Sequence, residues 1–211
     1  MNGFNLEQKM IHRLILQSSF VSDIGLLFGK MGMSLFFYEY ARYTSSEIYN
    51  DMGEELLDDV INQVHTGMPI RFDIGLSGIG WGIEYLLQNR FVEGDDKDIC
   101  EEIDREIMRT NLLRVKDSSL ESGLEGLFYY ISARLNRDSL QKDDFPFDVY
   151  YLEDLSCINS FFKIEDISEF CVRYPLSKER ILNGTIIDES SYMREPLGLK
   201  DGISGCLLNK I

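Results

Sequence analysis

Residues 23–38 read D-I-G-L-L-F-G-K-M-G-M-S-L-F-F-Y, and residues 73–88 read D-I-G-L-S-G-I-G-W-G-I-E-Y-L-L-Q, fifty positions later. A third copy begins at Asp117, and a fourth lies at the C-terminus, where Pro196 replaces the aspartate. The copies share a G-L-x-x-G-x-x-G pattern, complete or partial, followed by an apolar run. Repetition of this kind is typical of folds that repeat one supersecondary unit.

The repeated glycines need a packing reason, because glycine inside a helix costs about 1 kcal/mol relative to alanine. Glycines three or four positions apart lie on one helix face, where the missing Cβ lets a neighbouring backbone come close. We therefore expect a structural role for the following glycines: Gly25, Gly29, Gly32, Gly75, Gly82, Gly123, Gly126, Gly198, Gly202 and Gly205.

Helices of another character separate the copies. Ile48, Met52, Leu56 and Val60 recur at four-residue steps with acids opposite, which indicates an amphipathic surface helix. The predicted outer helices cover 5–20, 46–65 and 96–113, and the predicted buried inner helices cover 26–42, 76–90 and 120–136. The interval before the fourth copy is longer, so we expect a degenerate hairpin over 143–183.

Alternation of exposed and buried helices predicts an all-α fold, either an α/α toroid or a layered solenoid. The sequence contains no low-complexity stretch or linker, so residues 1–211 are expected to form a single domain.

The chain carries 36 acidic and 21 basic residues, a net charge of −15. Nucleic acid and anionic membranes are therefore not expected as partners. Met1–Met10 has no apolar h-region, and no stretch reaches the roughly 18 apolar residues of a membrane span, so a cytoplasmic location is expected. Acid runs such as Glu101, Glu102 and Asp104 are interpreted as solvated helix faces.

The repeated pattern, with amphipathic helices between its copies, resembles the lanthionine synthetase C-like (LanC-like) family of α/α toroids. The resemblance extends from about residue 20 to the C-terminus. It implies an α/α toroid, left as an incomplete ring by the shorter chain. It also implies a role in the bacterial modification of ribosomally made peptides, with a peptide substrate or a modification enzyme as partner.

Enzymes of that family use zinc, held by two cysteines and a histidine, to activate a cysteine thiol of the peptide. One ligand cysteine directly precedes the ligand histidine. This sequence has four cysteines and two histidines, His12 and His65, and no Cys-His pair. We therefore expect no metal site, no cofactor and no catalytic residues, and a binding or scaffold role.

The turns before the inner helices are the candidate binding site. Asp23, Asp73 and Asp117 recur before the first motif position, where they form either a carboxylate cluster or simple helix caps. The candidate binding residues on this rim are Asp73, Trp81, Glu121, Glu125 and Asp201. For Trp81, an aromatic platform for a ligand is weighed against ordinary core packing.

Two other functions stay open. In an α/α-barrel hydrolase acting on carbohydrate, rim carboxylates among Asp73, Glu121, Glu125 and Asp201 would flank a sugar bond about 5 to 10 Å apart. An α-solenoid adaptor would have a filled centre and an apolar edge for assembly. An open ring with such an edge would also allow a homodimer.

Overall fold

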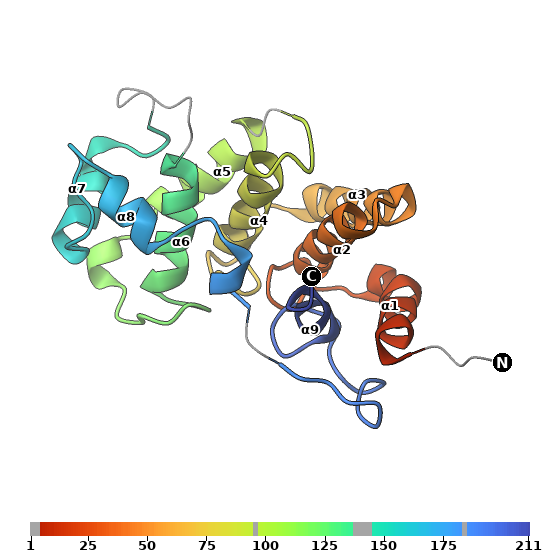
Figure 1. The fold of residues 1–211 in the computed structure, drawn as a ribbon. Coiled ribbons are helices and arrows are strands. Elements are labelled where there is room, and N and C mark those ends of the chain that lie inside the picture. The colour runs from red at the N-terminus through yellow and green to blue at the C-terminus, as the bar shows by residue number, and fades with distance from the viewer. Residues whose placement is uncertain (1–4, 95–96, 137–144, 183–184) are drawn as a thin grey trace. The chain divides into compact units, whose positions relative to one another are not determined.

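The computed structural model describes residues 5–94, 97–136, 145–182 and 185–211, and within these ranges the chain forms helices and no strand (Figure 1). The all-α prediction is therefore confirmed. The described α-helices are α1 (Leu6–Gln17), α2 (Lys30–Thr44), α3 (Glu47–Gln63), α4 (Leu76–Gln88), α5 (Lys97–Met108), α6 (Leu124–Leu135), α7 (Val149–Ile158), α8 (Ser168–Arg173) and α9 (Ile203–Leu208). Short 3-10 helices are η1 (Ser18–Phe20), η2 (Leu112–Arg114) and η4 (Lys178–Arg180). No helix in these ranges is long and apolar enough to cross a membrane.

The chain divides into two compact units. Unit 1 comprises Met1–Val64 with Lys178–Ile211, and unit 2 comprises His65–Ser177. Unit 1 therefore contains α1, α2, α3, η4 and α9, and unit 2 contains α4 to α8. The expectation of a single domain concerns how these units associate, and it stays a prediction.

The predicted helices occur in the predicted order. The outer segments correspond to α1, α3 and α5, and the inner segments correspond to α2, α4 and α6. In the long interval before the fourth copy, α7 and α8 form where a degenerate hairpin was expected, although residues 143–144 and 183 of that prediction lie outside the described ranges. The inner helices α2 and α6 begin later than predicted, at Lys30 and Leu124, because a seven-residue turn precedes each of them.

A seven-residue turn precedes each of α2, α4, α6 and α9. The four turns share one backbone geometry, and we call them the glycine turns. The amide of the first residue of each inner helix donates to the carbonyl oxygen seven residues earlier, at 2.9 Å in all four copies. The donor and acceptor pairs are Lys30 and Asp23, Leu76 and Pro69, Leu124 and Asp117, and Ile203 and Pro196. The glycine turns are therefore residues 23–29, 69–75, 117–123 and 196–202.

The shared geometry corrects the alignment of the second copy. Gly75 occupies the N-cap of α4, as Gly29 does for α2, so the two copies are related by 46 positions rather than fifty. The matching D-I-G spelling at Asp23 and Asp73 is a coincidence of sequence: Asp23 opens its turn, whereas Asp73 is the fifth residue of its own. The prediction that Asp23, Asp73 and Asp117 are equivalent is therefore wrong for Asp73.

The same geometry changes the role of the glycines. Gly25 lies in the turn rather than on the helix, and the last glycine of each turn is the N-cap of the helix that follows: Gly29, Gly75, Gly123 and Gly202. Every described glycine has a negative φ, so left-handed backbone is not the reason for these residues. Close approach is the reason: a Cβ on Gly75 would lie 2.0 Å from the carbonyl oxygen of Pro69, and one on Gly205 would lie 1.9 Å from that of Leu199.

Within each unit, two glycine turns pair through their backbones. In unit 2, the amides of Phe72 and Asp73 donate to the carbonyl oxygen of Glu121, at 2.9 and 3.1 Å. In unit 1, the amide of Lys200 donates to the carbonyl oxygen of Leu27 at 2.9 Å. The fourth residue of the turn is an apolar plug in both pairs, because Phe72 fills the space beside Gly126 and Leu199 the space beside Gly32.

Unit 1 is built around α2, which is buried along most of its length. The hairpin partner α3 approaches so closely that a Cβ on Gly53 would lie 2.9 Å from the ring of Tyr38. Helix α9 also packs against α2. Lys30 is only 6% exposed at a position where the other copies have leucine or isoleucine, and its Nζ pairs with Asp59 at 2.5 Å.

Unit 2 packs α4 against α6, and the contact is close because Gly80 leaves room for the ring of Tyr130. Trp81 and Tyr129 occupy equivalent positions on the two helices, and both rings contact Phe72. The centroid of the Phe72 ring lies 6.0 Å from that of Trp81 and 6.2 Å from that of Tyr129. The ring of Phe170 on α8 meets that of Phe128 on α6 edge to face. Aromatic rings therefore contribute substantially to the core of this unit, beside its buried leucines and isoleucines.

Candidate functional site

The candidate site in unit 2 lies at the glycine turns before α4 and α6. The side chain of Asp73 is 3% exposed and accepts from Arg71 Nε and Nη2, at 2.9 and 2.5 Å, and from the amide of Ile74 at 2.9 Å. These bonds engage both oxygens of the Asp73 carboxylate. Asp73 thereby orients the Arg71 guanidinium, which remains largely exposed.

Arg71 is the electrostatic centre of these turns, and the sequence analysis did not single it out. The hydrogen bond to Asp73 raises the pKa of Arg71, and the charges of Asp73, Asp117 and Glu121 add to the effect. One arginine therefore stands among three carboxylates, and the turns keep a negative excess. The signal in the sequence was the R-F-D triplet, which becomes visible only when the second copy is aligned from Pro69.

Asp117 holds the third glycine turn together. Its Oδ1 accepts from the amide of Ser119 at 2.8 Å, and its Oδ2 accepts from the Ser122 hydroxyl at 2.7 Å. These hydrogen bonds, the one from the Ser119 amide foremost, lower the pKa of Asp117. Asp23 makes the matching bond in the first turn, where its Oδ1 accepts from the amide of Gly25 at 2.7 Å. The capping interpretation thus describes both aspartates.

Glu125 is an accessible acid of the candidate site. It is exposed on the first turn of α6, as Asp117 is in the preceding glycine turn, and Glu121 in that turn is half-buried. Acids at a helix N-terminus are stabilised by the exposed amides there. Glu125 is therefore the predicted binding residue of unit 2 whose carboxylate a ligand can reach with little rearrangement.

Trp81 is fully buried in the core of unit 2. Its indole stacks on Tyr85 with centroids 5.3 Å apart, and it meets Phe72 edge to face. Within the described ranges, its Nε1 has no hydrogen-bond partner. These contacts favour core packing over an open aromatic platform for Trp81.

Asp201 belongs to unit 1, in the glycine turn before α9. Its backbone is left-handed, with a φ of 52°, and its Oδ1 accepts from the Thr185 hydroxyl at 3.3 Å. The side chain is exposed. The other four predicted binding residues lie in unit 2, so a shared role for all five stays a prediction.

The histidines and cysteines are dispersed. His12 is exposed on α1, and His65 follows α3 rather than lying within it, where its Nδ1 accepts from the amide of Gly67. Cys157 is exposed and the other three cysteines are buried. Across the described ranges, no group of three or more histidine, cysteine, aspartate or glutamate side chains is arranged to hold a metal ion.

A buried charge network in unit 2 is a feature that the sequence analysis missed. Arg134 on α6 donates from Nη1 to Glu84 Oε1 at 2.6 Å, and from Nη2 to Asp104 Oδ2 at 2.7 Å. The Tyr130 hydroxyl donates to Asp104 Oδ1 at 2.6 Å, and Gln88 Nε2 donates to Glu84 Oε2 at 2.8 Å. Asp104 is 2% exposed, so the interpretation of this residue as part of a solvated face is wrong.

The protonation states of this network fit a structural role in joining helices rather than a role in proton transfer. Burial by itself lowers the pKa of Arg134, but the hydrogen bond to Asp104 and the neighbouring charges outweigh it and raise the pKa. Burial, followed by the charge of Asp104, raises the pKa of Tyr130 well above its usual range. Arg134 therefore stays cationic and Tyr130 neutral, and together they join α4, α5 and α6. The available signal was a charged residue within the apolar run of two inner helices, Glu84 in α4 and Arg134 in α6.

Comparison of the chain with known protein families, curated proteins and solved structures finds no match.

Proposed function

We propose that this protein is a non-catalytic LanC-like α/α toroid that binds a peptide at its glycine turns, as a scaffold subunit in bacterial peptide modification. The observation that carries the proposal is the repeated glycine turn, with one closing hydrogen bond and one N-cap glycine in all four copies, and an apolar plug from one turn of each pair. A modification enzyme is the expected partner, and the cytoplasm is the expected location.

The pairing of the turns favours a ring over an open stack of hairpins. The amide of Asp73, the fifth residue of the second turn, donates to the carbonyl oxygen of Glu121, the fifth residue of the third turn. In the same way, the amide of Lys200 in the fourth turn donates to the carbonyl oxygen of Leu27 in the first. In a cyclic array the first copy follows the last, so the same donor and acceptor polarity is expected at both places. This shared polarity supports the proposed α/α toroid.

The chemistry of the turns favours a binding role and a basic ligand. The zinc-dependent reaction requires a thiolate and soft ligands, and the sequence contains no cysteine directly before a histidine. Around Arg71, the acids Asp117, Glu121 and Glu125 leave a negative excess at the turns of unit 2. A peptide that presents lysine or arginine would complement this charge.

Metal analysis and an addition assay test the non-catalytic part. The purified chain, expressed with added zinc, is expected to contain well below one zinc per molecule by mass spectrometry. It is also expected to leave a peptide with one cysteine and one dehydroalanine unchanged. Stoichiometric zinc together with thioether formation would refute this part of the proposal.

Peptide binding is tested separately by fluorescence anisotropy with a labelled 12-residue peptide of alternating lysine and leucine. The double variant Glu121→Gln/Glu125→Gln is expected to bind about tenfold more weakly at low salt, since each rim charge contributes up to roughly 1 kcal/mol. The control Glu101→Gln/Glu102→Gln removes two exposed acids from α5. Equal affinity losses in the two double variants would show only general attraction to an acidic protein and would contradict a site at the turns.

A further inference from the structure

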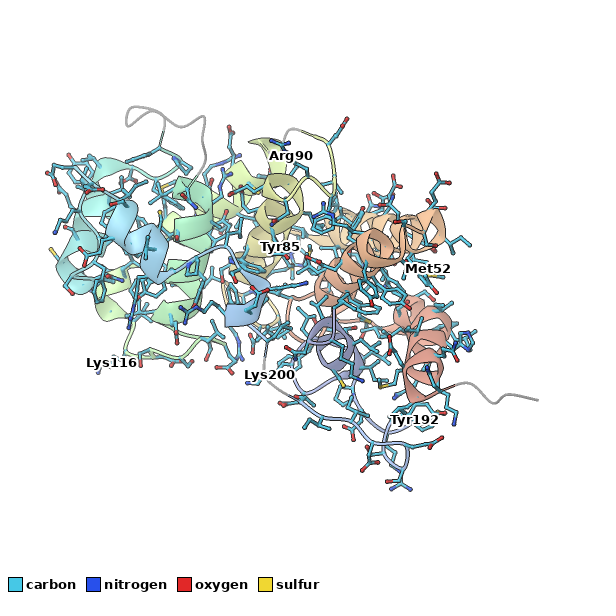
Figure 2. The ribbon with its side chains drawn as sticks, in the orientation of Figure 1. Met52, Tyr85, Arg90, Lys116, Tyr192 and Lys200 are labelled. Carbon is cyan, nitrogen blue, oxygen red and sulfur yellow. The ribbon has the colours of Figure 1, made fainter. Side chains whose placement is uncertain are left out.

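A groove in unit 1 lies between α1 and the segment before the fourth glycine turn. It has a volume of about 260 Å³ and is lined by Lys9, His12, Arg13, Leu16, Gln17, Tyr192 and Met193. Tyr192 lies beside α1 in Figure 2. Three of the seven lining residues are basic types and none is acidic, although acids outnumber Lys and Arg in the whole chain by 36 to 21.

Arg13 is the residue that points to a ligand. Its Nε donates to Gln17 Oε1 at 2.9 Å, and its Nη1 donates to the backbone oxygen of Tyr192. Within the described ranges, no carboxylate lies within ion-pair distance of Arg13, and its Nη2 has no acceptor. Burial lowers the pKa of Arg13, and the more distant charge of Glu195 does not reverse the shift. The guanidinium is thus partly desolvated without a counter-ion.

The remaining cation of the groove is already paired. Lys9 Nζ binds Glu189, which ties the segment before the fourth glycine turn to α1. Among the described residues, Arg13 is therefore the groove cation that no carboxylate contacts directly. A carboxylate would complement Arg13, because guanidinium and carboxylate form the strongest hydrogen bonds between side chains.

The rim of the groove is apolar and accessible. The side chain of Leu16 is 70% exposed and that of Met193 is 59% exposed, and they belong to the two segments that form the groove. Phe20, on η1 just after α1, is 85% exposed. Large apolar side chains concentrated beside an unpaired arginine are typical of surfaces that bind other proteins.

We infer that this groove binds a peptide segment that carries a carboxylate next to a large apolar side chain, with the carboxylate on Arg13 and the apolar group on Leu16 and Met193. The inference uses different residues and the opposite ligand charge from the proposed function, and it holds whether or not the glycine turns bind a peptide. Charge complementarity favours this occupant over a basic segment, which Arg13 would repel.

The test uses the full chain and a fluorescein-labelled peptide of 12 residues in which pairs of glutamates alternate with leucines. The matched probe has glutamine in place of glutamate. The acidic peptide is expected to bind, and Arg13→Gln is expected to weaken it by about tenfold or more, since a charge-assisted hydrogen bond contributes about that much. Arg109→Gln is the control, because Arg109 is exposed on unit 2 and, unlike Arg13, already pairs with a glutamate.

Met193→Ser keeps the test decisive if Arg13→Gln disturbs folding, because Met193 is exposed and on a loop. It is expected to weaken both probes about threefold, in keeping with loss of apolar contact alone. Three results would overturn the inference: equal affinity for the two probes, an unchanged affinity in a folded Arg13→Gln variant, or a dimer of the chain that Arg13→Gln dissociates, which would make a second copy the occupant.

Discussion

The substitution Gly126→Ala tests the close approach on which the glycine turns depend. Gly126 is the third residue of α6, and an added Cβ would lie 2.3 Å from the carbonyl oxygen of Leu120 and 2.4 Å from Cβ of Phe72. Leu120 belongs to the turn before α6, and Phe72 belongs to the paired turn before α4. One methyl group would therefore press on two turns at once.

The sign of the effect follows from two opposing contributions. Alanine has the better helix propensity, which favours the variant by up to about 1 kcal/mol. Each neighbour would have to move by about 1 Å to reach ordinary contact, and overpacking of this kind costs typically about 1 to 3 kcal/mol and occasionally more. Because backbone and a buried plug are both displaced, we expect a net loss of roughly 2 kcal/mol in the free energy of unfolding of unit 2.

The assay follows Trp81, which is the only tryptophan of the chain and packs against Phe72. Its fluorescence during urea unfolding reports on the part of unit 2 that Gly126→Ala would disturb. A loss of 2 kcal/mol also corresponds to a fall of roughly 4 to 8 °C in Tm for a chain of this size. Gly94→Ala is the control, because an added Cβ at Gly94 meets nothing within 4 Å.

The control variant is expected to change the unfolding free energy by no more than about 0.5 kcal/mol, or to raise it slightly by restricting the unfolded chain. A Gly126→Ala protein that is as stable as the parent, or more stable, would show that helix propensity dominates at this position. The argument from close approach would then be wrong for all four copies.

Other substitutions and a pH titration test the buried charges. Arg134→Met leaves two carboxylates buried without their cation, so we expect a loss of about 3 to 5 kcal/mol in urea unfolding at neutral pH; a loss below about 1 kcal/mol would mean that the network is solvated. Lys30→Leu restores the apolar residue of the other copies and leaves Asp59 half-exposed, where water can solvate it. We therefore expect the free energy of unfolding to stay unchanged or to rise by up to about 1 kcal/mol. A clear loss of stability would contradict this. Burial first, then nearby acids, raise the pKa of Tyr38 to about 12, so the fold favours the neutral phenol. Stability from this group is complete below pH of about 10 and is lost as the pH rises towards about 12, and ultraviolet titration of the folded protein that shows all phenols ionising together near 10 would exclude the shift.

Hydrophobic periodicity predicted the fold class and the order of the helices. The stripe through Ile48, Met52, Leu56 and Val60 placed α3, because surface helices need only one apolar face. In the structure Leu56 and Val60 are buried, whereas Ile48 is 68% exposed. The continuous apolar run after each glycine was likewise sufficient to mark α2, α4 and α6 as buried. These features depend on local sequence, so the positions and the burial of the helices could be predicted from it.

The predicted alignment of the second copy was wrong because it matched identical residue types, whereas the closing hydrogen bond of the turn defines which positions are equivalent. D-I-G-L occurs at Asp23 and again at Asp73, yet the closing hydrogen bond joins Leu76 to Pro69. The sequence contains no direct signal for a bond across seven residues. The alternative register, with Gly75 matched to Gly29 and Gly78 to Gly32, was available from the glycine spacing alone.

The sequence predicted the acids of the candidate site, and it did not predict which charged side chains pair with one another. Acids were expected at the turns, but the pairing of Asp73 with Arg71 depends on both side chains meeting in three dimensions. Arg134, Glu84 and Asp104 are brought together from three helices, and single-sequence periodicity cannot place partners so far apart. The groove around Arg13 likewise combines α1 with a segment about 180 positions away.

The pairing of the first and fourth glycine turns has a consequence for how the polypeptide emerges from the ribosome. Unit 2 is encoded by one continuous stretch, so every contact within it is available once Ser177 has left the exit tunnel. Helix α2 rests against α9, which follows it by about 160 positions along the chain. The hairpin of α2 and α3 must therefore wait for α9 with part of its apolar surface uncovered, and exposed apolar surface of this kind is what chaperones protect.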